Sequence, residues 1–172
     1  MPNVTALVPL DATAGADVVK AALARLFDPA TTELVLFRAG SEPVTHGVTV
    51  RRPSPSGGLN YDAYAEVPEA VPADGVWDSQ VWEAARTEVR DALEVEAAAF
   101  RRDGWTVRVE AALGPPAPAI REAAERNGVQ VIAMATHGRK GVARMVMGSV
   151  AEAVVRDAPV PVLLARPDAQ AG

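Results

Sequence analysis

The stretch that decides the fold is VQVIAMATHGRKGVARMVMGSVAEAVVRDAPVPVLLA, residues 129–165. Residues 129–134 and 160–165 are short apolar runs, which are typical of buried strands. Between them, residues 149–156 predict a helix that follows a glycine-bearing loop. A strand, a helix and a second strand in this order indicate a right-handed crossover between two parallel strands.

The same alternation extends toward the amino end. Further strands are predicted at residues 4–10, 33–39 and 105–113, and further helices at residues 19–26, 78–102 and 118–127. We therefore predict an α/β fold of the Rossmann-like class, a doubly wound, five-stranded parallel sheet with helices on both faces. Ligands of such sheets bind beyond the carboxyl ends of the strands, where the winding reverses, so the loops after residues 4–10 and 129–134 are the first candidates for a site.

The chain has 172 residues, a length that predicts one domain over residues 1–172. Residues 40–76 are rich in Pro, Gly and Ser and have no steady period, so we expect a long, mobile loop there. Residues 167–172 are expected to form a tail.

The composition excludes several classes of function. The chain is 49% hydrophobic but only 5% aromatic, as expected for a core of Val, Leu and Ala, and it has no cysteine for a disulfide, a thiolate zinc site or a thiol nucleophile. Its net charge of −5 argues against sequence-independent nucleic-acid binding. The start of the chain resembles no signal peptide, and no run is long enough for a membrane helix, so we expect a cytoplasmic protein whose partners are metabolites or proteins.

Gly148 and Ser149 stand directly before a predicted helix. Residues 149–152, Ser-Val-Ala-Glu, match a capping box, and a helix start with a neighbouring glycine can also bind an anion through its amides and dipole. Ser149 can therefore be read as a cap alone or as a phosphate ligand. The chain has no GxxxxGK[ST] loop, and no GxGxxG follows its first strand, so neither a Walker-type NTPase nor a dinucleotide fingerprint is supported.

The spacing of glycines in this loop resembles the universal stress protein family. Nucleotide-binding members carry a glycine, two residues, a second glycine, nine residues, and then Gly-Ser or Gly-Thr. Here Gly138, the nine residues 139–147 and Gly148-Ser149 match the second half, while Ala135 replaces the first glycine. Further similarities are Pro9 and Asp11 after the first strand, the Gly114-Pro115 turn, Val150, and the ending DAPVPVLL at residues 157–164. The resemblance covers residues 4–166 apart from 41–76.

The resemblance implies an adenine nucleotide alpha hydrolase-like fold that binds ATP, or ADP or AMP in its place, with magnesium as an accompanying ion. The adenosine would lie across the ends of the first, second and fourth strands. Pro9 and Asp11 would line the nucleoside, and Ala39 would offer its backbone to the adenine. The ribose would meet Met134 and Ala135. The residues implied to hold phosphates are Gly138, Gly148, Ser149 and Val150, and His137 and Arg139 lie in the same loop, where they could contact a phosphate or the ribose.

Two residues have alternative roles. Asp11 could cap the first helix instead of binding ligand. Ala135 adds a methyl group and, if its position needs a positive φ, a strain on the order of 1 kcal/mol, which would weaken binding.

The leading hypothesis is an adenine-nucleotide-binding regulatory or stress-response protein. The alternatives are a nucleotide-free dimerisation module that has lost binding, and a slow ATPase or nucleotidyl transferase. The sequence assigns no catalytic residue and no protein ligand for a metal.

The last strand predicts a homodimer. Residues 160–165 are too apolar to be left exposed, yet Pro161 cannot donate to a strand ladder and so favours an edge strand. Members of the family resembled here pair this strand across a two-fold axis. A protein partner that responds to the bound nucleotide is also expected, and its identity stays unknown.

Overall fold

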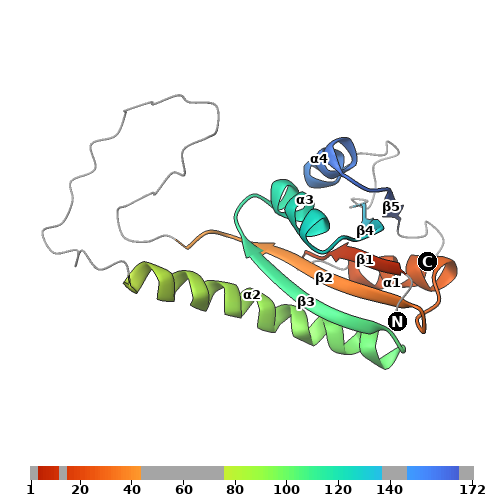
Figure 1. Ribbon diagram of the computed structural model, residues 1–172, viewed down its shortest axis with the longest axis horizontal. Helices are drawn as coiled ribbons and strands as arrows, with labels where there is room; N and C mark the ends of the chain where they lie inside the picture. Colours follow the sequence, from red (N-terminus) through yellow and green to blue (C-terminus); the bar gives the residue numbers. More distant parts are fainter. Residues whose placement is uncertain (1–3, 12–14, 44–75, 137–146, 167–172) are drawn as a thin grey trace, which may run out of the picture.

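The computed structural model describes residues 4–11, 15–43, 76–136 and 147–166 (Figure 1). Five strands alternate with four helices in the described residues, as the sequence predicts. The elements are β1 Val4–Pro9, α1 Gly15–Leu26, β2 Thr32–Gly40, α2 Val76–Arg102, β3 Thr106–Leu113, α3 Pro116–Arg126, β4 Val131–Ala135, α4 Ser149–Asp157 and β5 Val162–Ala165.

The strands form one parallel sheet in the order β3-β2-β1-β4-β5. The chain winds outward from β1 through β2 to β3, and then crosses back to β4 and β5 on the other side. The winding therefore reverses between β1 and β4, and this is the place where doubly wound sheets bind their ligands. The predicted fold class is confirmed.

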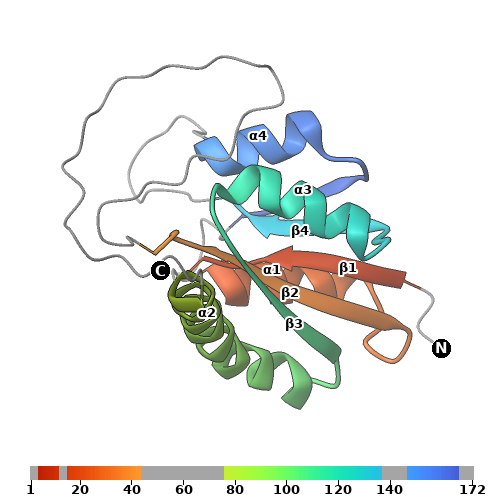
Figure 2. The same ribbon diagram turned by 60° about the vertical axis from the view of Figure 1, so that its left-hand side comes forward.

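The helices cover both faces of the sheet (Figure 2). Because side chains alternate along a strand, Leu34 and Leu36 of β2 join the core beneath α1 and α2, while Val35 and Phe37 join the core beneath α3 and α4. All four side chains are fully buried. Parallel sheets that are covered on both faces need such continuous apolar runs.

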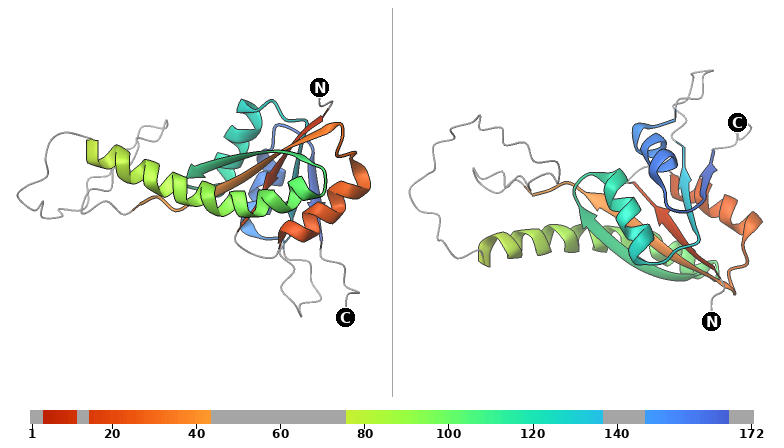
Figure 3. Two further views of the ribbon diagram at one scale, coloured as in Figure 1. Left: turned by 90° about the horizontal axis from the view of Figure 1, so that it is seen from below. Right: turned by 45° about the horizontal axis from the view of Figure 1, so that its top comes forward.

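Helix α2 is much longer than the sheet requires, and its amino-terminal part extends past the strands (Figures 1 and 3). Its carboxyl-terminal part buries Leu93, Ala97 and Phe100 against the sheet. Val81, in the amino-terminal part, is 40% exposed, because that part of α2 lies beyond the strands.

Several predicted boundaries move by one to three residues. Strand β5 begins at Val162 rather than at residue 160, although the carbonyl of Pro161 already accepts a hydrogen bond of 3.0 Å from the amide of Ile132. Gly40 ends β2 and Val76 begins α2, so most of the loop predicted at 40–76 lies outside the described residues, as does the tail at 167–172. No helix in the described residues is long and apolar enough to span a membrane.

Candidate functional site

A cavity of about 280 Å³ opens at the carboxyl ends of β1, β2 and β4, beside the starts of α1, α3 and α4. This volume is close to the lower end of ordinary ligand pockets, roughly 300 Å³. The cavity brings together eight of the eleven residues predicted for the site. They are Pro9, Asp11, Ala39, Met134, Ala135, Gly148, Ser149 and Val150. His137, Gly138 and Arg139, the other three, lie outside the described residues.

One wall of the cavity is the place where β1 leaves β2. The last ladder bond between these strands is donated by the amide of Leu10 to the carbonyl of Phe37, at 2.8 Å. On the other side of β2, the carbonyl of Gly40 accepts a bond of 2.9 Å from the amide of Gly114. Backbone groups alternate in direction along a strand, so the N–H and C=O of Ala39 point to the side of β1, beyond the last bond of that ladder.

The opposite wall is the start of α4. The amide of Glu152 donates to the carbonyl of Gly148 at 2.9 Å, which is the first bond of the helix. Gly148 is therefore the N-cap residue, with an extended backbone of φ −63° and ψ 150°, and no side chain caps the helix. The predicted capping box is wrong, because Ser149 is already the first helical residue and a capping serine must precede it.

This shift by one residue changes what Ser149 can do. The amides of Ser149, Val150 and Ala151 precede the first helical bond and have no acceptor inside the helix. These three residues line the cavity together with Gly148, and Ser149 is exposed. A Cβ atom on Gly148 would meet no described atom within 4 Å, so the fold itself does not need a glycine there. The arrangement can bind an anion through amides, a hydroxyl and the helix dipole.

Ala135 differs from the expectation in one respect. It lies in β4 and pairs with Ala165 of β5, in the extended conformation of a strand. The position does not need a positive φ, so the strain expected for that case does not arise. The methyl group of Ala135 therefore takes up space at this position but does not strain the backbone. It packs against the core on the side of α1.

The chemistry of the cavity is mostly apolar. Among the described residues that line it, Asp11 carries the one charge and Ser149 the one hydroxyl. Asp11 is exposed and precedes the start of α1 at Gly15 by four positions. In the described part of the chain, no group of three or more histidine or acidic side chains could hold a metal ion.

Six lining residues were not predicted. Leu10 and Ala151 adjoin predicted residues, and Gly15 begins α1. Phe37 belongs to the buried row of β2, and Pro116 and Ile120 reach the cavity because α3 packs across the sheet. No local pattern marks the last three residues as site residues, since tertiary packing alone brings them to this edge. The six residues are Leu10, Gly15, Phe37, Pro116, Ile120 and Ala151.

Known proteins share this architecture. The chain is 34% identical over 96 residues to the universal stress protein MJ0531 of Methanocaldococcus jannaschii, a match that spans 56% of this chain and 56% of that relative's length. The structure superposes on universal stress protein UspA from Lactobacillus plantarum with a TM-score of 0.58 at 18% identity, over 96% of this chain and 99% of the other. It also superposes on a universal stress protein family protein from Arabidopsis thaliana, solved with AMP bound, with a TM-score of 0.55 at 10% identity, over 98% of this chain and 94% of the other.

At these identities the two superpositions establish the fold alone. The family follows from the sequence, because the family model described as "Universal stress protein family" matches residues 5–166, nearly the whole chain. The prediction made from the glycine spacing is confirmed, and this chain belongs to the universal stress protein family.

Proposed function

We propose that this chain binds an adenine nucleotide, ATP first of all, and works as a regulatory module rather than as a catalyst. The observation that carries the proposal is the convergence of eight predicted residues on one cavity that the start of α4 closes on one side. The Arabidopsis thaliana relative, which shares the fold, was solved with AMP bound and supports the class of ligand.

The adenine would lie at the apolar end of the cavity, against Phe37 and Ile120. The backbone of Ala39 offers one N–H donor and one C=O acceptor on the side of β1. The Watson–Crick edge of adenine has an acceptor at N1 beside a donor at N6, which complements this pair, whereas guanine has a donor at N1 beside an acceptor at O6. Because an unmatched pair leaves polar groups unsatisfied, we expect ATP to bind in preference to GTP.

The phosphates would lie at the start of α4. The amides of Ser149, Val150 and Ala151 and the hydroxyl of Ser149 are donors at the positive end of the helix dipole. The described lining holds one carboxylate, that of Asp11, so a magnesium ion would take its ligands mainly from the phosphates.

The ribose would lie between these two ends, against Met134 and Ala135. The extended backbone of Ala135 favours binding over the nucleotide-free alternative, since the alanine imposes no strained conformation on the cavity wall. The apolar lining offers few groups for acid–base chemistry, which favours a binding module over an ATPase.

We also propose a homodimer through β5. This strand is at the edge of the sheet, and its Val162, Leu163 and Leu164 are only partly buried. A second copy of the strand would cover these side chains and satisfy the backbone groups that point away from β4. The cytoplasmic location and the responding protein partner stay predictions.

Two experiments test the proposed function. Mass spectrometry of the small molecules released from denatured protein should detect an adenine nucleotide. Competition between ATP and GTP for the purified protein should favour ATP by at least about tenfold, because GTP would leave the Ala39 backbone groups unsatisfied. Equal affinity for the two nucleotides would contradict the assignment of Ala39, and steady release of phosphate from ATP would favour the enzyme alternative.

A further inference from the structure

Arg38 lies in β2 between two residues that line the cavity, Phe37 and Ala39, but it does not line the cavity itself. It belongs to β2, on the face that carries α1 and α2, next to Phe37 and Ala39, whose side chains belong to the other face. Its side chain is 12% exposed. The Nε atom donates to the carbonyl of Leu10 and the Nη2 atom to the carbonyl of Asp11, both at 3.1 Å.

These two carbonyls belong to residues of the cavity wall. Leu10 and Asp11 line the cavity just after β1 ends, beyond the last ladder bond with β2. Backbone carbonyls in such a place need donors from outside the ladder. The guanidinium supplies two donors in a planar fork, which fixes the direction of both carbonyls at once.

Glu96 of α2 holds Arg38 in this position. Its Oε1 atom accepts a hydrogen bond from Nη2 of Arg38, in an ion pair between a side chain 12% exposed and one 28% exposed. The Oε2 atom is buried and has no hydrogen-bond partner within the described part of the chain. Because Oε1 is bound to Arg38, and Arg38 to Leu10 and Asp11, the pair connects α2 to the turn after β1.

We propose that Arg38 is a positioning residue for the nucleotide site. It holds the main chain of Leu10 and Asp11 in the shape that the nucleoside meets, and it acts through that main chain rather than by contact with the ligand. The inference rests on the proposed function and adds to it a residue that no sequence motif marks.

The test removes the whole ion pair. Arg38→Met alone would strand the carboxylate of Glu96, so a loss of folding would hide any effect on the site. In the double variant Arg38→Met/Glu96→Met both charges are gone, and apolar side chains of similar size fill the space, so the variant should unfold at about the same urea concentration as the wild type. Calorimetry should then show ATP affinity reduced by about tenfold, because the carbonyls of Leu10 and Asp11 are no longer held.

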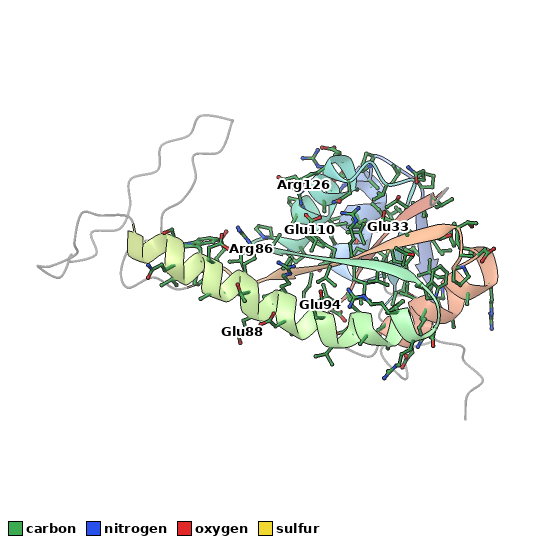
Figure 4. All side chains as sticks on the ribbon, turned by 60° about the horizontal axis from the view of Figure 1, so that its bottom comes forward. Glu33, Arg86, Glu88, Glu94, Glu110 and Arg126 are labelled. Carbon is green, nitrogen blue, oxygen red and sulfur yellow. The ribbon has the colours of Figure 1, made fainter. Side chains whose placement is uncertain are left out.

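The matched control is Arg108→Met. It breaks the 2.6 Å ion pair between Arg108 of β3 and Glu33 of β2, at the opposite end of the sheet from Arg38. Figure 4 shows Glu33 on the side of the sheet where α3 lies, together with Arg126 of α3 and Glu110, which pairs in register with Phe37 nearer the carboxyl ends of the strands. This variant should bind ATP with the affinity of the wild type.

Wild-type affinity in the folded double variant would overturn the proposal. Should the double variant fail to fold, Arg38→Lys keeps the charge pair but not the fork, and it should show the same direction of change.

Amide exchange separates this inference from the proposed function. In the double variant without any nucleotide, the amide of Leu10 should exchange at least about tenfold faster than in the wild type, while the amide of Leu7, inside β1, should be unchanged. If the wild type binds no nucleotide, the proposed function fails, and this exchange rate still decides whether Arg38 holds the turn. Equal rates for Leu10 in both proteins would overturn that role.

Discussion

A Cβ atom built on Gly15 would lie 3.1 Å from the Cβ of Ala135, closer than ordinary van der Waals contact. Gly15 begins α1 and Ala135 ends β4, so the two residues share one small space beside the cavity. Nucleotide-binding members of the family that this loop resembles have glycine at the position of Ala135. In this chain the methyl group of Ala135 lies where α1 begins with a glycine, and the absent Cβ of Gly15 makes room for it.

This relationship predicts coupled substitutions. Gly15→Ala should lower the free energy of unfolding by about 1 kcal/mol, because the added methyl group is overpacked against Ala135. Ala135→Gly alone should cost a similar amount, about 1 kcal/mol, because glycine weakens a strand. The double variant should lose less than the sum of the two, with a coupling free energy of about 1 kcal/mol in urea unfolding. Additive losses would show that the two residues do not share the space.

Ala135→Gly should also tighten the binding of ATP. The methyl group lines the cavity where the ribose is proposed to lie, so its removal lets the nucleoside approach the strand more closely. Calorimetric titration of ATP into this variant and the wild type measures the change. Weaker binding to the folded variant would mean that the methyl group contributes contacts instead of limiting approach.

Gly148→Val should abolish ATP binding while the protein stays folded. Position 148 has φ −63° and open space around a Cβ atom, so valine fits the free protein and costs about 1 kcal/mol as a poor N-cap. Gly128→Ala is the matched control, since Gly128 has a φ of +56°, does not line the cavity, and should cost a similar amount of stability, about 1 kcal/mol. Loss of binding in both variants would assign the effect to stability rather than to the phosphate site.

Ser149→Ala separates phosphate binding from capping. Ser149 is the first helical residue and makes no capping bond, so the free energy of unfolding should change by less than about 0.5 kcal/mol. The affinity for ATP should fall by about tenfold, because a hydroxyl bond to a charged phosphate is lost. Urea unfolding and calorimetry measure the two quantities. A stability loss with unchanged affinity would restore the capping role.

The proposed dimer can be tested by a substitution on the free edge of β5. The carbonyl of Pro161 accepts a bond from the amide of Ile132 in β4, and the carbonyl of Ala165 accepts one from the amide of Thr136, just after β4. The backbone groups of Val162 and Leu164 alternate with these and therefore point away from the sheet. Val162→Pro removes one outward donor and leaves the ladder to β4 intact. Light scattering should give a dimer for the wild type and a monomer for the folded variant at micromolar concentration. A monomeric wild type would contradict the dimer.

The alternation of strands and helices could be predicted from the sequence because each element carries its own local signal. The apolar runs of β1 and β4 appear in the structure as expected, and α3 ends within one residue of the predicted end, before Asn127 and Gly128, with Gly128 in the left-handed region. Helix α4 begins at Ser149 as predicted, but its N-cap is Gly148 and not Ser149. Either Gly148 or Ser149 can serve as an N-cap, and the choice depends on which carbonyl accepts the first helical bond.

Other parts of the site have no local signal. Phe37 and Ile120 look like ordinary core residues in the sequence, and they reach the cavity because β2 ends and α3 crosses at the same edge. Arg38 and Glu96 are 58 positions apart, and a charged residue in a strand or on a helix is usually a solvated side chain. The pairing of β2 with β1 and the packing of α2 are needed before their roles can be recognised.

Calorimetric titration of ATP and magnesium into the wild-type protein, freed of co-purified nucleotide, tests the central claim most directly. The cavity between Ala39 and the start of α4 predicts saturable binding of one ATP per chain, at micromolar to submillimolar concentration, and no binding to Gly148→Val. Absence of heat up to millimolar ATP in the wild type, together with no nucleotide released on denaturation, would contradict the claim.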